Sequence, residues 1–330
     1  MTKKRIITLI LTICMIVSTA FVFASCDLFF FLFPEDYEIP EGSAEFHFVD
    51  VGQGDATLIF ADGKTILIDT GEKDSQNVLI NYLKDKGIET INYFIITHFD
   101  SDHFGEATEV LENFEIENLI IPDQVKTTKM YTTFMAAVNA RPEMFVSVIE
   151  DNDDIGDMIE VDDIVDLDTD DRFLYVGELD PEVEDDRGDL VLEFFGPVKD
   201  TYSNSNDYSI IVLISWGQNS ILFTGDAEEK AEEALVDKYP YTLASKIDCD
   251  VFKAGHHGSR TSSSQEIIDA ASPEYVIISC GYENDYGHPH SEAMNRFKNA
   301  VAEENIYRTD MQGTIILTTD GQLITITTEK

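Results

Sequence analysis

Four side chains of metal-binding type stand within six residues of one another, namely His98, Asp100, Asp102 and His103. They follow an apolar run, residues 91–96, which predicts a buried strand. A loop at the end of a strand can direct several side chains at one point, and imidazole and carboxylate groups are ligands for divalent cations. A polar turn with solvated acids would have the same composition, so this segment alone leaves both interpretations open.

Two further strand ends carry groups of the same kind. Residues 222–226 place Asp226 after an apolar run, where its carboxylate could bridge two cations, although Gly-Asp after a strand is also a common turn. Residues 251–259 place His256 and His257 after another apolar run. Because consecutive side chains diverge, we expect one of this pair to bind metal and the other to donate a proton or contact substrate. The sequence leaves open which does which.

A fourth loop, residues 284–290, adds His288 and His290. Six of the seven histidines of the chain therefore lie in three loops that follow predicted strands. The seventh, His47, lies within a predicted strand and is interpreted as structural. Histidines scattered through a core would not be sorted in this way, so the distribution itself favours a shared site.

The elements that must position these loops alternate between strands and helices. Mixed strands and helices with several hairpins favour a two-sheet α/β layer architecture over a single doubly wound sheet. We expect strands at residues 45–51, 56–60, 65–69, 91–97, 118–121, 208–215, 220–223, 249–253, 275–280, 314–319 and 322–328, and helices at residues 76–86, 108–114, 127–139, 228–238, 264–271 and 292–304.

The chain is strongly acidic. Its 22 Lys and Arg against 64 Asp and Glu give a net charge of −42. Phosphate backbones are repelled by such a chain unless a local site or a bound cation reverses the field. Residues 150–193 alone hold 20 acidic residues and two arginines. We interpret them as solvated β-hairpins or an acidic excursion of the sheet, with a cation-binding surface as the alternative.

The N-terminus has the pattern of an export signal. Three basic residues at positions 3–5 precede an apolar run at residues 6–24, and small residues then lead to Cys26 as in a bacterial lipobox. We expect residues 1–25 to be a lipoprotein-type signal peptide, residues 26–43 an anchor and tether, and residues 44–330 the folded domain. An uncleaved signal anchor is the alternative. Either would place the domain on the outer face of the cell membrane.

Only Cys249 and Cys280 lie in the body of the chain. An exported pair could form a disulfide, but two buried free thiols would suit their apolar surroundings equally well. Neither has the spacing of a metal site with another cysteine.

Taken together, these motifs resemble the ComEC-type metallo-β-lactamase hydrolases, the soluble hydrolase domain of the competence proteins. The resemblance spans residues 44–328, and we expect the chain to lack the membrane channel of those proteins. It is carried by residues 48–56, 66–71, 98–105, 206–209, 224–226, 256–259 and 284–289.

The resemblance implies an α/β fold of the αββα metallo-β-lactamase sandwich type with two divalent metal ions, Zn or Mn. General relatives have His at the position of Asp100, and a carboxylate there favours Mn over Zn. Water activated between the two cations would be the nucleophile, because cations lower its pKa towards roughly 7. The implied metal ligands are His98, Asp100, Asp102, His103, Asp226 and His257. Asp102 and His256 are the expected catalytic groups, and the expected substrate-binding or supporting residues are Asp55, Asn206, Ser209, Ser259, Asn284 and His288.

The leading functional expectation is an extracytoplasmic phosphodiesterase or nuclease, acting on single-stranded DNA or a smaller phosphodiester. Hydrolysis of an ester, lactone or lactam on the same site is one alternative, and a non-enzymatic surface binding protein is another. The sequence points to no protein partner. Four basic residues near the last motifs could form a local rim, but we interpret them as ordinary surface charges: Lys253, Arg260, Lys298 and Arg308.

Overall fold

The computed structural model describes residue 37, residues 39–40, 42–73, 76–149, 190–199 and 201–330, and the backbone of residues 173–176. The expected signal peptide, most of the tether and most of the acidic segment at residues 150–193 lie outside the described residues. Within the described part of the chain, no helix is long and apolar enough to cross a membrane.

Eight strands form the first sheet, in the order β15-β14-β1-β2-β3-β4-β5-β6. Pairing is antiparallel from β15 to β3 and parallel from β3 to β6. The strands are β1 (Ala44–Phe48), β2 (Thr57–Ala61), β3 (Lys64–Ile68), β4 (Thr90–Ile95), β5 (Glu115–Pro122), β6 (Phe145–Ile149), β14 (Ile315–Thr319) and β15 (Ile324–Thr328).

Seven strands form the second sheet, in the order β13-β12-β11-β10-β9-β8-β7. Strands β7 to β10 are antiparallel and β10 to β13 are parallel. The strands are β7 (Phe173–Val176), β8 (Leu190–Gly196), β9 (Ile211–Trp216), β10 (Asn219–Phe223), β11 (Val251–Lys253), β12 (Tyr275–Ile278) and β13 (Ile306–Arg308).

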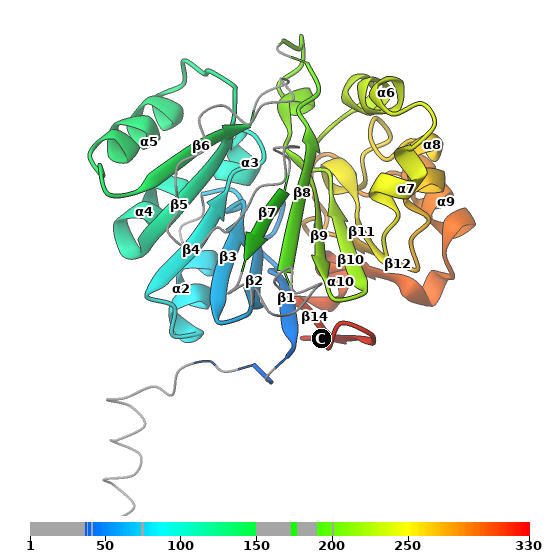
Figure 1. Cartoon of the computed structure of the whole chain (residues 1–330), viewed down its shortest axis with the longest axis horizontal. Coiled ribbons are helices and arrows are strands. Elements are labelled where there is room, and N and C mark those ends of the chain that lie inside the picture. Colours follow the sequence, from blue (N-terminus) through cyan, green and yellow to red (C-terminus); the bar gives the residue numbers. More distant parts are fainter. Residues whose placement is uncertain are drawn as a thin grey trace, which may run out of the picture.

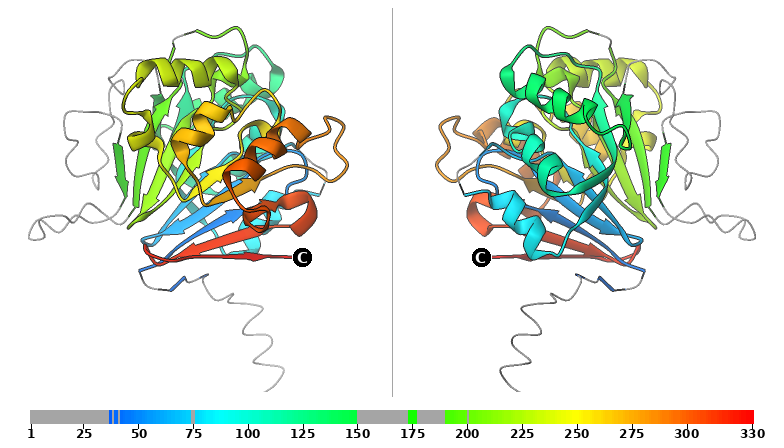
Figure 2. Two further views of the ribbon diagram at one scale, coloured as in Figure 1. Left: turned by 90° about the vertical axis from the view of Figure 1, so that its right-hand side faces the viewer. Right: turned by 90° about the vertical axis from the view of Figure 1, so that its left-hand side faces the viewer.

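The two sheets face each other, and helices cover both outer faces (Figure 1; Figure 2). The first sheet carries α2 (Val78–Asp85), α4 (Ala107–Asn113) and α5 (Lys129–Asn139); the second carries α6 (Glu229–Lys238), α7 (Leu243–Ile247), α8 (Gln265–Ala271) and α9 (Ser291–Ala300). Two one-turn helices, α3 (Ser101–Phe104) and α10 (Thr309–Gln312), follow β4 and β13. The predicted αββα sandwich is confirmed.

Alternating side chains explain the layers. Along β9, Val212 and Ile214 point into the core between the sheets, whereas Ile211 and Leu213 point into the core beneath the helices. Successive side chains of a strand face opposite sides, so a strand buried on both faces is apolar throughout. This is why the runs that precede the polar loops contain few polar residues.

Several expected boundaries differ from the observed ones. The strand expected at residues 208–215 begins at Ile211, because Asn206–Tyr208 forms a short 3-10 helix. Helix α3 was expected as loop, since a single turn leaves no periodicity to detect. Strands β6 and β13 were also not expected. The helix expected at residues 292–304 ends at Ala300, and a short 3-10 turn, Glu303–Asn305, follows it.

Three side chains outside the predicted site, those of Cys249, Cys280 and His47, are buried in the fold. Cys249 and Cys280 are free and buried, and burial raises the pKa of Cys280 to about 12, so neither thiol is reactive at neutral pH. His47 is buried on β1, where Nδ1 lies 2.6 Å from the Tyr82 hydroxyl and Nε2 lies 3.0 Å from Glu45 Oε2.

Candidate metal centre

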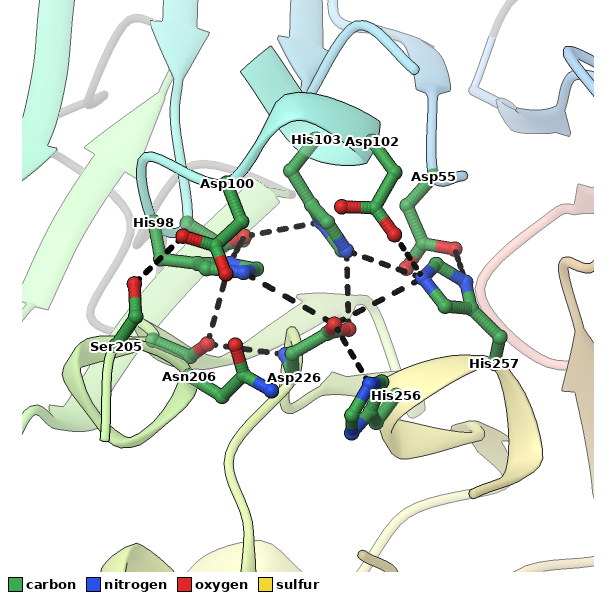
Figure 3. A network of polar contacts seen from close by, with 12 residues as sticks. Asp55, His98, Asp100, Asp102, His103, Ser205, Asn206, Asp226, His256 and His257 are labelled. Carbon is green, nitrogen blue, oxygen red and sulfur yellow. Dashed lines mark hydrogen bonds and ion pairs between the residues drawn. The ribbon is translucent and has the colours of Figure 1, made fainter. Parts of the chain in front are cut away.

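The loops singled out in the sequence converge at one edge of the sandwich (Figure 3). They follow β4, β10, β11 and β12 and border a cavity of about 390 Å³. Strand β4 belongs to the first sheet and β10, β11 and β12 belong to the second, so residues from both halves of the chain come together where the carboxyl ends of these strands meet at one end of the two-sheet sandwich. Seven of the predicted site residues line this cavity: Asp100, Asp102, Asn206, Asp226, His256, His257 and His288.

Four buried side chains form the centre of the cluster. Asp55, His103, Asp226 and His257 each present a ligand atom, and these atoms all lie within 4.8 Å of one another. Asp226 Oδ1 lies 2.9 Å from His103 Nε2, and Asp226 Oδ2 lies 3.7 Å from His257 Nε2. Asp226 is therefore placed in the middle, as a bridging carboxylate would be (Figure 3).

Two further groups border this centre. Asp102 Oδ2 lies 3.2 Å from His257 Nε2, and His98 Nε2 lies 3.9 Å from Asp226 Oδ2. Burial and the neighbouring His103 lower the pKa of His98 to about 4, so its imidazole is neutral at pH 7. A neutral imidazole is the form that binds metal.

The cluster has the chemistry of a cation site. His98 Nε2 and Asp226 Oδ1 are buried and have no hydrogen-bond partner, although buried polar atoms are normally paired. Asp226 Oδ1 is close to His103 without hydrogen-bond geometry, as expected for atoms that point at a common centre rather than at each other. Burial alone would lower the pKa of His257, yet Asp226 and Asp55 raise it to about 10. The carboxylates thus favour positive charge at this position, which a divalent cation would supply.

His103 is held by a carboxylate that the sequence analysis did not assign to the site. Its Nδ1 donates to Asp69 Oδ2 at 2.7 Å, and Asp69 in turn accepts from the backbone NH and the hydroxyl of Thr97 at 2.7 and 2.6 Å. This fixes the ring so that Nε2 faces the cluster. Asp69 lies in the motif at residues 66–71, which was used only for the resemblance.

His257 has a backbone carbonyl and the Asp55 carboxylate beside its Nδ1 atom. Asp55 Oδ1 lies 3.2 Å from His257 Nδ1, which also lies 3.0 Å from the Ser279 carbonyl oxygen. Lys253 Nζ donates to Asp55 Oδ2 at 2.6 Å, and both side chains are buried. Burial alone would raise the pKa of Asp55, but Lys253 and His257 lower it well below its usual value. The interpretation of Lys253 as a surface charge was wrong.

A glycine allows the Asp55 and Asp102 loops to touch. Gly54 has φ of 140°, and a Cβ there would lie 2.4 Å from the Asp102 carbonyl oxygen. The Asp55 NH donates to that same oxygen at 3.1 Å. A side chain at position 54 would separate the two loops.

Comparison with known proteins agrees with this arrangement. The family model described as "Metallo-beta-lactamase superfamily" matches residues 49–282. The chain belongs to the metallo-beta-lactamase superfamily. It is 29% identical over 308 residues to ComE operon protein 3 of Bacillus subtilis, covering 88% of this chain and 34% of that protein. It is 31% identical over 261 residues to Recombination protein 2 of Haemophilus influenzae, covering 77% of this chain and 26% of that protein. The chain thus spans about a third or less of the length of these curated relatives.

Solved structures of the superfamily are similar to it at lower identity. The metallo-beta-lactamase fold protein YhfI from Bacillus subtilis is 11% identical with a TM-score of 0.44, and covers 80% of this chain and 95% of its own. The metallo hydrolase Igni18 from Ignicoccus hospitalis is 13% identical with a TM-score of 0.46, and covers 84% of this chain and 98% of its own.

Asp100, the position at which general members of the superfamily were expected to have His, points partly away from the cluster. Its Oδ1 accepts from Lys126 Nζ at 2.8 Å and from the Ser205 hydroxyl at 2.6 Å, and Lys126 also contacts Ser205. Burial alone would raise the pKa of Asp100, but these two donors lower it. Asp100 lines the cavity as an ionised carboxylate within the same loop as His98 (Figure 3).

The two adjacent histidines differ in burial and contacts. His257 is fully buried, whereas 21% of the His256 side chain is exposed. His256 Nε2 lies 3.6 Å from Asp226 Oδ2, and its Nδ1 lies 3.1 Å from Glu228 Oε1, to which Asn206 also donates. Both histidines have positive φ, 48° and 54°, which is strained for non-glycine residues. This backbone turns the two rings in different directions.

The remaining predicted residues divide into supporting and loop-forming groups. The Ser209 hydroxyl accepts from the Asp226 NH at 2.9 Å and so supports the central carboxylate. Ser259 and Asn284 were expected as substrate-binding or supporting residues, and both bond neighbouring atoms of the loops. Ser259 is buried and bonded to Thr261, and Asn284 bonds the backbone of His288 and Gly281. Neither borders the cavity.

The other three residues of the expected basic rim are ordinary charges that pair with acids. Arg260, Lys298 and Arg308 lie 3.5, 2.5 and 2.7 Å from carboxylate oxygens of Glu292, Glu303 and Asp310, respectively. Among the described residues that line the cavity, Lys126 is the one lysine or arginine.

Proposed function

We propose that the chain is a metal-dependent hydrolase that cleaves phosphodiesters outside the cytoplasm. The observation that carries the proposal is the buried convergence of Asp226 with three histidines, His98, His103 and His257, at the base of the cavity. The buried His98 Nε2, which has no hydrogen-bond partner, favours a metal site over a structural ion-pair network.

The proposed ligand sets share Asp226. Asp102, His103 and His257 would hold one cation with it, and His98 and Asp100 would hold a second. Zn or Mn suits a mixed set of imidazole and carboxylate ligands. Bound there, the cations would lower the pKa of a water molecule and stabilise the charge that develops on the phosphoryl group.

The chain's own residues would supply orientation and proton transfer. Asp69 and Asp55 fix the rings of His103 and His257 through their Nδ1 atoms. Asp102 lies at the floor of the cavity, where its carboxylate would orient the attacking water. The Nε2 atom of His256 borders the cavity and would donate a proton to the leaving oxygen.

The phosphodiester class is favoured by charge and by the relatives. Lys126 places a positive charge among the cavity residues of a strongly acidic chain, which suits an anionic substrate. Two relatives are named for recombination and competence, processes that handle DNA. The basic and apolar leader with Cys26 supports our proposal that the domain acts as a lipoprotein on the outer face of the membrane, or behind an uncleaved signal anchor.

The test compares the hydrolysis of phosphodiester, ester and lactam bonds by the same protein. The purified full-length chain is stripped of metal, reconstituted with Mn or Zn, and assayed with bis(p-nitrophenyl) phosphate, single-stranded DNA, p-nitrophenyl acetate and a chromogenic cephalosporin. We expect metal-dependent cleavage of the phosphodiesters. Cleavage of the ester or the lactam alone would replace the phosphodiesterase proposal. Stoichiometric metal without any hydrolysis would favour a binding protein.

The substitution Asp69→Asn tests whether Asp69 holds the His103 ring in position for metal binding. Asn is nearly isosteric and tolerates the positive φ of 58° at this position, so the backbone should be retained. It accepts less strongly than a carboxylate, so we expect metal affinity to fall by about 10- to 100-fold. Competition with a chromophoric chelator measures this. An unchanged affinity would show that Asp69 does not support the metal centre.

A further inference from the structure

The loop between β12 and α9 presents an aromatic ring at the mouth of the cavity. Tyr286 is 66% exposed although it lines the cavity. Its ring is stacked on His288, with centroids 5.7 Å apart and planes inclined by 22°. One face of the phenol is therefore covered by His288, and the opposite face is left to solvent.

Beyond His288, further ring contacts continue inward to the cluster. The His288 ring centroid lies 5.3 Å from that of His256 and 6.0 Å from that of His257. His288 itself is buried, so the rings run without interruption from the candidate proton donor to the surface. A group stacked on the open face of Tyr286 would lie close enough to extend a substrate whose reacting bond is at His256.

The loop is held by Asn284, which was expected to bind substrate or to support the site. The Asn284 amide donates to the Gly281 and His288 carbonyl oxygens at 2.8 and 2.6 Å, and its oxygen accepts from the His288 NH at 2.9 Å. The His290 NH donates to the Gly258 carbonyl oxygen, which ties this loop to the loop of His256 and His257. Asn284 thus fixes the position of the ring instead of contacting the substrate.

We propose that Tyr286 is a stacking platform for the base of a nucleoside phosphodiester, which makes a nucleotide the substrate class of this site. This inference rests on the proposed phosphodiesterase function. Aromatic side chains bind single-stranded nucleic acid by stacking on the bases, whatever their sequence. A cavity of about 390 Å³ matches one small ligand, and the net charge of −42 disfavours a long electrostatic track along a polymer. The platform therefore selects a terminal or isolated nucleotide unit.

The experiment removes the Tyr286 ring from the protein and, separately, the bases from the substrate. Wild type, Tyr286→Leu, Tyr286→Phe and Tyr282→Leu are assayed with thymidylyl-thymidine and with its analogue in which both bases are absent. Tyr282 is the matched control, because it lies in the same loop, is 74% exposed and does not line the cavity. Binding of thymidine 5′-monophosphate and of deoxyribose 5-phosphate is measured in parallel by calorimetry.

We expect wild type to bind the base-containing compounds more tightly, and Tyr286→Leu to raise their KM and Kd roughly 10-fold. The abasic compounds should be unaffected, and Tyr286→Phe and Tyr282→Leu should behave as wild type. Equal handling of the two dinucleotides by wild type would overturn the platform and leave the phosphodiesterase intact. If neither dinucleotide is cleaved, the proposed function fails. Weaker binding of thymidine 5′-monophosphate by Tyr286→Leu would then still support the stacking platform, and unchanged binding would overturn it.

Discussion

Asp226→Asn is expected to abolish hydrolysis, with a fall in kcat/KM of at least about 10³-fold, equivalent to about 4 kcal/mol of transition-state stabilisation. Asp226 is the carboxylate that lies among His98, His103 and His257, so the substitution removes the charge shared by both proposed ligand sets. The amide has nearly the same shape and should leave the fold unchanged. The measurements are kcat/KM and metal content after dialysis, with circular dichroism to verify the fold.

Asp250→Asn is the matched control for this experiment. Asp250 precedes β11, at the end of that strand opposite to the cluster, and accepts from the Ser220 NH at 2.9 Å and from Asn219. An amide oxygen can accept the same bonds, so activity and metal content should stay at the wild-type level. An Asp226→Asn protein that keeps its metal and most of its activity would exclude Asp226 as a shared ligand.

Lys253→Met should be the most destabilising of the substitutions described, lowering the free energy of unfolding of the metal-free protein by about 3–5 kcal/mol. Methionine fills similar space but leaves the buried Asp55 carboxylate without its cation. Asp55 would then hold His257 less firmly, and metal affinity should fall by about 10- to 100-fold as well. Urea denaturation and metal titration measure the two effects separately.

The double variant Asp55→Asn/Lys253→Met tests whether the unpaired charge of Asp55 causes the loss of stability in Lys253→Met. It removes both charges, so it should recover much of the stability lost in Lys253→Met while its metal affinity stays low. Lys298→Met, at an exposed ion pair with Glu303, should cost less than about 1 kcal/mol. A Lys253→Met protein as stable as Lys298→Met would show that the buried pair does not determine stability.

Much of the site could be predicted because its residues follow apolar strands. The shared feature of His98, Asp102, His103, Asp226 and His257 is that each follows the carboxyl end of a strand, and the two facing sheets bring these ends together at one end of the sandwich. The same regularity made the two-sheet architecture predictable. Sequence spacing alone shows which residues lie at the edge but not which of them point inward.

The residues that sequence reasoning missed or misplaced act through other residues. Asp69 contacts His103 and does not line the cavity, but it directly follows the apolar residues 66–68 within a motif that carries the resemblance, and that position was the signal that could have assigned it to the site. Lys253 was interpreted as a surface charge because lysine is rarely buried, and its partner Asp55 is 198 residues away in the sequence. Pairs so distant in sequence become visible only when the sheets are assembled. For Asn284 the sequence left substrate binding and a supporting role both open, and its amide bonds backbone atoms of its own loop.

Because β14 pairs with β1, the first sheet cannot be completed before β14 has been synthesised. Ala44 pairs with Thr319, so β1 receives its second neighbour from a strand that is synthesised long after β1 itself. Ile315 and Leu317 also belong to the core between the two sheets. Until the ribosome has released this segment, β1 has an open edge on which other strands can pair, and the central core lacks part of its apolar surface. A premature stop or a proteolytic cut just before residue 315 would therefore yield an aggregation-prone folding intermediate, not a slightly shorter folded protein.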